Sequence, residues 1–376
     1  MAAVMIIFVS LVTIAYSLFF IGLILLPRQW HVLPKVSNRA GAMISVIVPF
    51  RNEALNLPAI LDDLVAQDYY RENLEIILVN DHSTDDSFSI IEKRTKQFSN
   101  LKLVSLPIES TGKKAAIGYA VSLAKGDLIF TTDADCRLPQ KWISSTVSYY
   151  KQTGARLILG PVRYNQGKSI FSRMLALEFT SLVSTAAAMA LLKKPILCNG
   201  ANMAFEKSVF PESIDIMEPT TPSGDDIFLL LHVKKIFPDK IRFHLSEDAL
   251  IETKPPGNIH EFLEQRVRWF SKSSFYSDHE IILTGIIVAF MNAGLIISLL
   301  TGLLFPKFLF IPLAVILLKC IIDFLFLIPY LAFFRQNSLC VLIPLVGVLY
   351  PFYLFFVAAK SLKGKFIWKG RSYFIR

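Results

Sequence analysis

The sequence has only four cysteines, and none of them forms a Cys-X-X-Cys pair. A disulfide framework or a zinc site is therefore not expected, and a reducing compartment fits this cysteine use. Charged residues make up only 18% of the chain, and their balance gives a net charge of +9. No nucleic-acid-binding motif accompanies this charge, so we expect no nucleic acid partner. An anionic membrane surface or a phosphorylated substrate explains the basic excess better.

The first 26 residues contain no charged side chain. This run exceeds the ~20 residues that an apolar helix needs to cross a bilayer. It also lacks the basic start and the small-residue cleavage site of a signal peptide. We therefore predict an uncleaved transmembrane anchor over residues 1–26, with the basic residues that follow it on the cytosolic side.

Three further apolar runs lie near the end of the chain, over residues 281–304, 306–334 and 339–359. Each is long enough to span a bilayer, so we predict a C-terminal transmembrane region over residues 281–359. The basic tail that follows, residues 360–376, favours the cytosol. Three spans would place this tail outside, so the prolines of these runs favour one re-entrant or broken segment.

Two polar features interrupt the apolar segments. Lys319 and Asp323 lie four residues apart in the middle C-terminal run and would share one helix face. An ion pair inside a membrane is costly, so the two residues form either a packing pair between helices or a polar lining for a lipid or glycan path. Residues 174–192 are apolar apart from Glu178, and we expect this segment to lie at the membrane interface.

Between the anchor and the C-terminal runs, residues 43–277 show short apolar strands that alternate with helices. We expect strands over 44–49, 74–80, 101–106 and 127–132, and helices over 56–67, 85–98 and 113–124. This alternation is typical of an α/β domain whose mostly parallel sheet is covered on both faces. In such sheets ligands bind at the carboxyl ends of the strands.

Polar residues follow the first two predicted strands, where a ligand would bind. Pro49 and Glu53 lie at the end of the first strand, and Asp81 lies at the end of the second. Since Asp81 comes directly off a buried strand, its carboxylate can accept hydrogen bonds from a uracil or a ribose. Asp85 and Asp86 follow closely, and a helix N-cap explains them as well as a ligand does.

Asp133 and Asp135 lie one residue apart directly after the fourth predicted strand. If the chain leaves the extended conformation there, both carboxylates face one cation. Mg²⁺ and Mn²⁺ take oxygen ligands of this kind and often bridge to substrate phosphates, so we predict a site for Mg²⁺ or Mn²⁺ at Asp133 and Asp135. The Asp-X-Asp pattern is common in loops, and its place after an α/β strand is what favours a metal site.

Asp225 and Asp226 precede an apolar helix that begins near Ile227. One interpretation is a helix N-cap. The other is a general base, because an attacking hydroxyl must lose its proton and a carboxylate within hydrogen-bond reach can take it.

Two basic motifs complete the set. Lys113 follows Gly112 at the start of a predicted helix, and its cationic side chain suits a phosphate, although a solvated basic turn explains it too. Gln265, Arg268 and Trp269 fall on one helix face. The arginine can brace a diphosphate and the tryptophan can stack on a sugar, while an Arg/Trp anchor at the membrane interface is the alternative.

In this order and spacing, the motifs resemble the family 2 glycosyltransferases, a group of inverting enzymes with the GT-A fold. The resemblance covers about residues 44–269, together with the flanking membrane segments. The family signature D, D, D, QxxRW is matched here by Asp81, Asp133 with Asp135, Asp226, and Gln265 with Arg268 and Trp269. Each motif is weak alone, but the ordered set is highly specific.

The resemblance also implies roles for individual residues. Pro49, Glu53 and Lys113 match positions that line the nucleotide. Asn202, with Gly200 before it, matches a segment near the acceptor.

At the base position the family usually carries an acidic pair such as Glu-Asp, whereas this chain has Asp225-Asp226. We assign the base to Asp226, the second of the pair. The implied mechanism is a single in-line displacement that inverts the anomeric centre.

The resemblance implies a donor that is a nucleotide-diphosphate sugar, with UDP the favoured nucleotide, and an acceptor that is a membrane lipid or a lipid-linked glycan. It implies an integral membrane protein with a cytosolic catalytic domain, in the plasma membrane or in a bacterial inner membrane. A processive polysaccharide synthase is the first alternative, and a non-catalytic glycan or lipid translocation component is the second. A nucleotidyltransferase fits poorly, because residues 49–53 contain no glycine.

Overall fold

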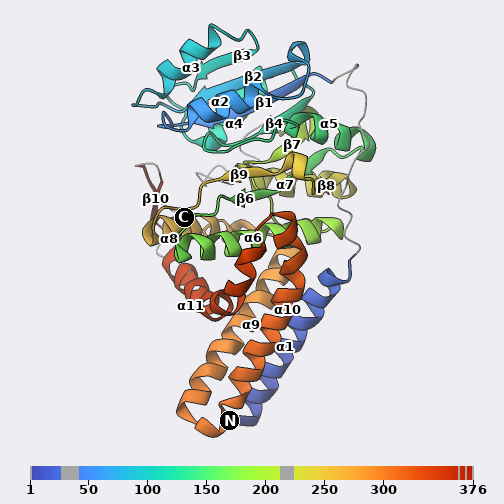
Figure 1. Ribbon diagram of the computed structural model, residues 1–376, viewed down its shortest axis with the longest axis vertical. Coiled ribbons are helices and arrows are strands. Elements are labelled where there is room, and N and C mark those ends of the chain that lie inside the picture. Colours follow the sequence, from blue (N-terminus) through green and yellow to red (C-terminus); the bar gives the residue numbers. More distant parts are fainter. Residues whose placement is uncertain (1, 27–41, 212–223, 363–364, 369–370, 375–376) are drawn as a thin grey trace. The chain divides into compact units, whose positions relative to one another are not determined.

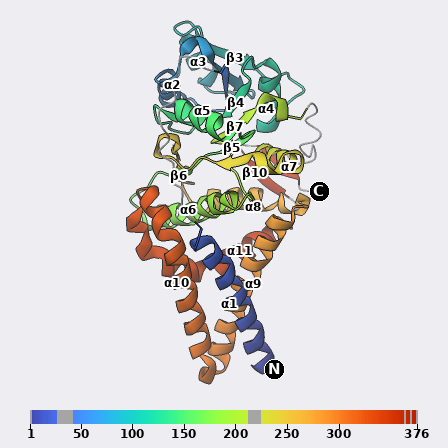
Figure 2. The ribbon, with the colours of Figure 1, turned by 90° about the vertical axis from the view of Figure 1, so that its right-hand side faces the viewer.

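The computed structural model describes residues 2–26, 42–211, 224–362, 365–368 and 371–374. The contacts between residues divide the chain into two compact units, whose elements are drawn in Figures 1 and 2. Unit 1 comprises residues 1–28, 166–189 and 255–366, and unit 2 comprises residues 29–165, 190–254 and 367–376.

A seven-stranded sheet forms the centre of unit 2, and its strands follow the order β3-β2-β1-β4-β7-β5-β8. Its strands are β1 (Ile44–Phe50), β2 (Leu74–Asn80), β3 (Leu101–Ser105), β4 (Leu128–Thr131), β5 (Leu157–Leu159), β7 (Met203–Glu206) and β8 (Ile241–Phe243). Strands β1 to β4 are parallel, β7 is antiparallel to β4 and β5, and β5 and β8 are parallel. The strands β6 (Val162–Tyr164) and β9 (Ile251–Thr253) pair separately, in parallel.

Helices alternate with the first four strands, as the sequence predicts. The helices of unit 2 are α2 (Leu57–Val65), α3 (Ser87–Thr95), α4 (Lys113–Leu123), α5 (Trp142–Thr153) and α7 (Asp225–Ile236). Strands β1 and β2 are buried almost throughout. Because both of their faces are covered, their sequences are mostly apolar without strict alternation, and this is why the pattern identifies them. The predicted α/β fold class with a mostly parallel sheet is confirmed.

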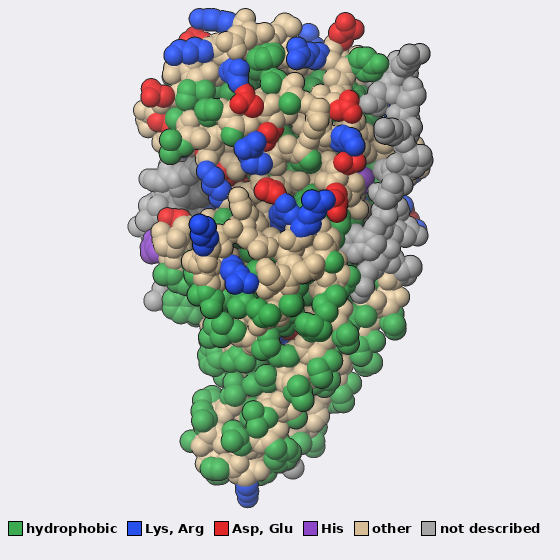
Figure 3. Space-filling model, in the orientation of Figure 1, with side chains coloured by type: hydrophobic (Ala, Val, Ile, Leu, Met, Phe, Trp, Pro, Cys, Tyr) green, Lys and Arg blue, Asp and Glu red, His purple; other side chains and the backbone are tan. Residues whose placement is uncertain are grey.

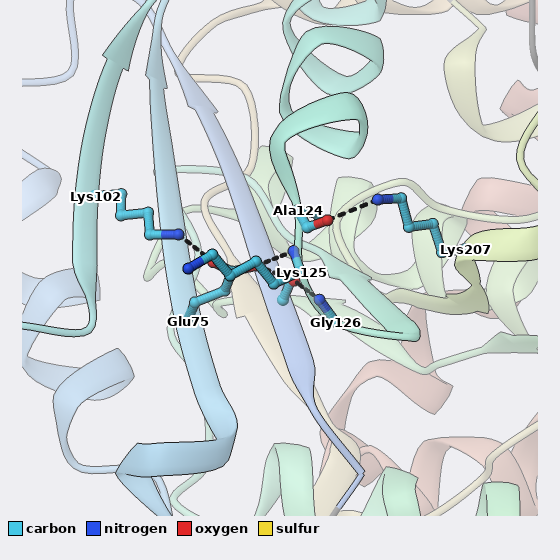
Figure 4. Close-up of polar contacts among 7 residues, drawn as sticks. Glu75, Lys102, Ala124, Lys125, Gly126 and Lys207 are labelled. Atoms are coloured by element: carbon cyan, nitrogen blue, oxygen red, sulfur yellow. Dashed lines mark hydrogen bonds and ion pairs between the residues drawn. The ribbon is translucent and has the colours of Figure 1, made fainter.

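One buried carboxylate, that of Glu75 in β2, links three strands at the edge where the parallel strands begin (Figure 4). It accepts hydrogen bonds from Ser45 Oγ of β1 and from Lys102 Nζ of β3, each at 2.5 Å. The backbone amide of Lys125 also donates to it. Ser45 Oγ in turn accepts from the amide of Gly126 at 2.8 Å. These contacts fasten the loop before β4 to β1 and β2.

Replacing Glu75 with glutamine is expected to lower the free energy of unfolding of unit 2 by roughly 2 kcal/mol, because an amide nitrogen cannot accept the hydrogen bonds that a carboxylate oxygen accepts. Burial by itself raises the pKa of Glu75, but the hydrogen bonds from Lys102, Ser45 and the Lys125 amide outweigh it and hold the pKa below its ordinary value of 4.5. The stabilisation is therefore complete above that value and is lost as the pH falls through the lowered pKa.

Denaturant unfolding of the detergent-solubilised protein, measured at pH 7 and again below pH 4.5, would test this prediction. The difference between wild type and Glu75→Gln should shrink at the lower pH. Glu72→Gln is the control, because it is the same substitution at an exposed position nearby. A difference of equal size at both pH values would contradict the assignment.

Unit 1 consists of helices, most of which are long and apolar. They are α1 (Ala2–Ile24), most of α6 (Ile170–Leu191), α8 (Ile259–Phe270), α9 (His279–Leu304), α10 (Phe310–Phe333) and α11 (Ile343–Ser361). Helices α1, α9 and α10 pack side by side (Figures 1 and 2). Hydrophobic side chains cover the surface of these helices (Figure 3), and many of their leucine and phenylalanine side chains are exposed. An apolar surface of this extent is typical of contact with lipid.

Five helices of the described part of the chain are long and apolar enough to cross a membrane. Four of them, α1, α9, α10 and α11, occupy the four apolar runs that the sequence analysis identified, and only 22–33% of each is buried. The fifth is α6, which was expected at the membrane interface and is 72% buried within the protein. These helices indicate an integral membrane protein.

The basic tail contributes two short strands. Strands β10 (Lys365–Trp368) and β11 (Arg371–Phe374) pair with each other. The cytosolic side of residues 360–376 and the re-entrant segment stay predictions.

The division into units differs from the predicted domain boundaries at 43–277 and 281–359. Helices α6 and α8 fall within the predicted α/β domain by sequence, yet they group with the apolar helices. Polar contacts join these helices, since Glu178 of α6 pairs with Arg266 of α8 and accepts a hydrogen bond from Tyr353 of α11.

The intramembrane pair predicted from the sequence joins two helices. Lys319 Nζ lies 2.5 Å from Asp323 Oδ2 within α10. Tyr16 of α1 donates a hydrogen bond to Asp323 Oδ1, also at 2.5 Å. The side chains of Lys319 and Asp323 are only 8% and 14% exposed. These contacts favour the first of the two predicted alternatives, a packing contact between helices.

Candidate functional site

The candidate residues of unit 2 begin at one edge of its sheet. Strands β1, β2 and β4 are adjacent and parallel, so their carboxyl ends meet at the same edge. Pro49 lies near the end of β1, and Glu53 lies shortly after that strand. Asp81 directly follows β2, and Asp133 and Asp135 follow β4. This edge is where parallel sheets bind their ligands.

Asp81 connects the loop after β2 to the start of α4. Its side chain is buried, and its Oδ2 accepts a hydrogen bond from the amide of Gly112 at 3.1 Å. Pro49 is partly exposed on β1. The amide of Glu53 donates to Ser87 Oγ at 2.8 Å, and its Oε2 accepts from the side chain of Asn56 at 2.6 Å.

Lys113 lies among three carboxylates, those of Asp133, Asp225 and Asp226. Its Nζ is 2.5 Å from Asp133 Oδ1 and 3.9 Å from Asp225 Oδ2. Burial by itself lowers the pKa of Lys113, but the three carboxylates outweigh it and raise the pKa above its ordinary value. Lys113 is therefore a permanent cation at the centre of an acidic cluster.

A glycine with positive φ precedes each helix that carries these residues. Gly112 has φ 93° directly before Lys113, and Gly224 has φ 103° directly before Asp225. Only glycine adopts such angles without strain. The two glycines therefore allow the chain to turn sharply from the loop into the first turn of each helix. The acidic pair then lies at the N-terminus of α7, where the helix dipole stabilises negative charge.

The two carboxylates of the pair differ in their surroundings. Asp225 is 8% exposed and faces Lys113. Asp226 is partly exposed; its Oδ1 accepts from the amide of Ile227 at 2.8 Å and its Oδ2 from the amide of Gly200 at 3.3 Å. Asp226 is thus the oriented carboxylate that a substrate can more easily reach.

Gly200 brings its backbone against the acidic cluster. A Cβ at this position would lie 3.2 Å from both Lys113 Nζ and Asp225 Oδ2. The close approach leaves no room for a side chain without movement of the charged groups. The resemblance places this segment near the acceptor, but nothing in the sequence indicates its contact with Lys113.

The side chain of Asn202 is buried and fully engaged in hydrogen bonds within unit 2. It is 4% exposed, and its carboxamide accepts from Trp142 Nε1 at 2.9 Å and donates to the carbonyls of Pro161 and Ala249 at 2.8 Å. These bonds hold β7 against α5 and the neighbouring loops. A contact between Asn202 and the acceptor stays a prediction.

The oxygen ligands predicted for a metal are present, but they are few. Asp133 and Asp135 are partly exposed. Among the described residues, no group of three or more His, Cys, Asp or Glu side chains is arranged to hold a metal ion. Burial raises the pKa of the adjacent Cys136 well above its ordinary value, so this thiol does not act as a thiolate ligand. The ligand set therefore fits a hard cation such as Mg²⁺ or Mn²⁺ that also binds substrate phosphates. Lys113 beside Asp133 shows that this position accommodates positive charge.

The remaining predicted residues lie on α8 of unit 1. Gln265, Arg268 and Trp269 are all partly exposed. Their approach to the carboxylates of unit 2 stays a prediction. Between them lies Arg266, which is 5% exposed and which the sequence analysis did not select.

Comparison with known proteins identifies a family for part of the chain. The family model described as "Glycosyl transferase family 2" matches residues 45–212. The chain is 34% identical over 140 residues to an undecaprenyl-phosphate 4-deoxy-4-formamido-L-arabinose transferase of Aeromonas hydrophila subsp. hydrophila, covering 37% of this chain and 42% of that protein. It is 28% identical over 127 residues to a poly(ribitol-phosphate) beta-glucosyltransferase of Bacillus spizizenii, covering 34% of this chain and 20% of that one. The chain thus spans less than half the length of these relatives.

Among solved structures, the chain resembles the mannosyltransferase PcManGT from Pyrobaculum calidifontis, which was solved in complex with GDP-Man and Mn²⁺. The TM-score is 0.56 at 19% identity, over 93% of this chain and 98% of that one. At this identity the likeness concerns the fold. Taken with the parallel sheet and the carboxylates at its edge, these findings show that residues 45–212 form a family 2 glycosyltransferase domain and that the chain has a GT-A fold.

Proposed function

We propose that this protein transfers a sugar from a nucleoside-diphosphate sugar to a lipid or lipid-linked glycan acceptor, with inversion at the anomeric carbon. The observation that carries the proposal is the cluster in which Lys113 lies among Asp133, Asp225 and Asp226 at the N-termini of α4 and α7 and the end of β4. Such a cluster combines a cation for the leaving group with a carboxylate for the nucleophile.

Asp226 is the general base of this proposal. As the acceptor hydroxyl oxygen forms its bond to the anomeric carbon, the bond between that carbon and the diphosphate oxygen breaks, and the hydroxyl proton passes to Asp226. The amides of Gly200 and Ile227 orient the Asp226 carboxylate for this step. Asp225 faces Lys113 instead and fixes its ammonium group.

Lys113 and the aspartates after β4 act on the leaving group. Asp133 and Asp135 would hold Mg²⁺ or Mn²⁺ together with the diphosphate, and the bound cation would neutralise the charge that develops on the leaving nucleoside diphosphate. Lys113, which stays protonated, would also stabilise the negative charge of the diphosphate. The Mn²⁺ in the mannosyltransferase structure supports this assignment.

The other predicted residues complete the donor and acceptor sites. Pro49, Glu53 and Asp81 would line the nucleotide at the sheet edge. Gln265, Arg268 and Trp269 would organise the diphosphate and the acceptor, and Asn202 would support the acceptor side through the segment that contains Gly200.

The apolar helices and the relatives support an acceptor in the membrane. Five helices in the described part of the chain are long and apolar enough to cross a bilayer, and one relative is named as an undecaprenyl-phosphate 4-deoxy-4-formamido-L-arabinose transferase. We place the sheet domain in the cytosol, because the basic residues after the anchor and in the tail favour that side. UDP is the proposed nucleotide of the donor.

The purified protein, in detergent with Mn²⁺ or Mg²⁺, should be given UDP-glucose, UDP-galactose, UDP-N-acetylglucosamine and GDP-mannose in turn, with and without a membrane lipid extract. Mass spectrometry should detect a lipid that is heavier by one sugar with one of these donors. A ladder of products or a high polymer would instead identify a processive polysaccharide synthase. Folded protein without turnover of any donor would contradict the proposal and favour a non-catalytic translocation component.

A further inference from the structure

A buried ion pair joins α6 to α8 within unit 1. Arg266 of α8 directs two guanidinium nitrogens at the two carboxylate oxygens of Glu178, with Nε donating to Oε1 at 3.0 Å and Nη2 donating to Oε2. The two side chains are 5% and 4% exposed. A paired, bidentate geometry is what makes such a buried charge tolerable.

A third helix contributes to the same pair. Tyr353 of α11 donates a hydrogen bond from its hydroxyl to Glu178 Oε1 at 2.6 Å. Its ring packs against Phe262 of α8, with 5.4 Å between ring centroids. Glu178 thus accepts from α8 and α11 at once, and the position of α8 is fixed against two neighbours.

Arg266 also contacts two of the three residues of the predicted motif. Its Nη1 donates to Gln265 Oε1 at 2.6 Å. Its guanidinium lies over the ring of Trp269, 4.2 Å from the ring centroid, and Phe179 of α6 packs against that ring at 6.2 Å. A guanidinium over an aromatic face restricts the ring because the attraction depends on its orientation.

No other residue type reproduces this set of contacts. The planar fork of arginine can bind both carboxylate oxygens, a neighbouring amide oxygen and an aromatic face together, whereas a lysine presents a compact point charge. An Arg266→Lys substitution therefore keeps the charge that Glu178 requires and loses the geometry.

We propose that Arg266 is a positioning residue. Glu178, which also binds Tyr353, holds Arg266 in place, and Arg266 in turn fixes the side chains of Gln265 and Trp269. The helix α8 thereby presents these two side chains to the acceptor and the diphosphate. The inference rests on the proposed transferase function for its catalytic consequence. Arg266 does not itself need to touch the substrate.

The catalytic test compares Arg266→Lys with wild type in the transfer assay. The kcat for transfer should fall by about 10- to 100-fold, because small misplacements of positioning groups have effects of this size, while the KM for the donor changes by less than about twofold. Tyr353→Phe, which keeps the ion pair and removes one hydrogen bond, should give a smaller loss of the same kind. Lys360→Met is the matched control, since it breaks the Lys360–Glu264 contact of 2.6 Å that also joins α11 to α8.

A spectroscopic test does not depend on activity. The chain has four tryptophans, so protein labelled with 5-fluorotryptophan should give a small set of ¹⁹F signals, among which Trp269→Phe assigns that of Trp269. The Trp269 signal should shift or broaden in Arg266→Lys and stay unchanged in Lys360→Met.

The outcomes test the positioning role of Arg266 and the proposed transferase function separately. A moved Trp269 signal together with a lowered kcat per folded molecule supports the positioning role. An unmoved Trp269 signal in Arg266→Lys, or an unchanged kcat, overturns it. Wild-type protein that transfers no sugar would refute the proposed function, and the ¹⁹F signal would still decide whether Arg266 holds Trp269.

Discussion

Asp226→Asn is expected to lower the kcat of sugar transfer by about 10²–10⁴-fold and to leave the KM for the donor within about twofold of wild type. The asparagine keeps the shape of the side chain and retains an oxygen that can accept from the amide of Gly200 or Ile227. It cannot take a proton from the acceptor hydroxyl. Initial rates at varied donor and acceptor concentrations would separate the two constants.

Two variants make this test specific. Asp239→Asn makes the same change at an exposed position, 73% exposed beside Lys193, and should leave the kcat and the KM unchanged. Asp225→Asn removes a partner of Lys113 and should act mainly on the KM for the donor. An active Asp226→Asn together with an inactive Asp225→Asn would move the base to Asp225.

The first half of the fold follows from the sequence because its strands are buried on both faces. Every residue of β2 is buried, and residues 76–79 form an apolar run that is bounded by the paired Glu75 before it and Asn80 after it. The later strands β5, β7 and β8 contain three or four residues each. Segments of that length hold too little periodicity to be recognised, and the antiparallel direction of β7 is decided by tertiary pairing.

The acidic residues of the candidate site and Lys113 could be selected from the sequence, whereas the contacts between them could not. Asp133 and Asp226 occur in motifs with a known order along the chain. Lys113 has a solvated turn as an equally good explanation from sequence, and only the fold brings it to Asp133 and Asp225. The contact of Gly200 with Lys113 and Asp225 carries no local signal, because it depends on atoms that are remote in sequence.

The helical periodicity that identifies Gln265, Arg268 and Trp269 does not identify Arg266. Helical spacing groups Gln265, Arg268 and Trp269 on one face, and Arg266 falls outside that group. The signal that could have found it lies on α6, where Glu178 interrupts an apolar helix. A carboxylate in such a helix requires a buried cation, and the structure supplies it from α8.

Removal of divalent metal with EDTA is expected to lower the transfer rate by at least about a hundredfold, and Mn²⁺ or Mg²⁺ should restore it. The reason is the charge balance of the cluster. Three carboxylates lie around the ammonium of Lys113, and an incoming diphosphate adds further negative charge, so a divalent cation that accompanies it lowers the repulsion. Asp133→Asn should raise the Mn²⁺ concentration needed for half-maximal activity, and Asp86→Asn, an exposed aspartate beyond the site, should not.

Direct Mn²⁺ binding, followed by electron paramagnetic resonance with UDP present, would test the same assignment without turnover. Free Mn²⁺ gives a strong signal that weakens on binding, and Asp133→Asn should restore it. Full activity in EDTA would contradict the metal site. Lys113 would then be the group that neutralises the leaving diphosphate, and its substitution by methionine should in that case abolish transfer, because its ammonium contacts Asp133 and Asp225 in the acidic cluster.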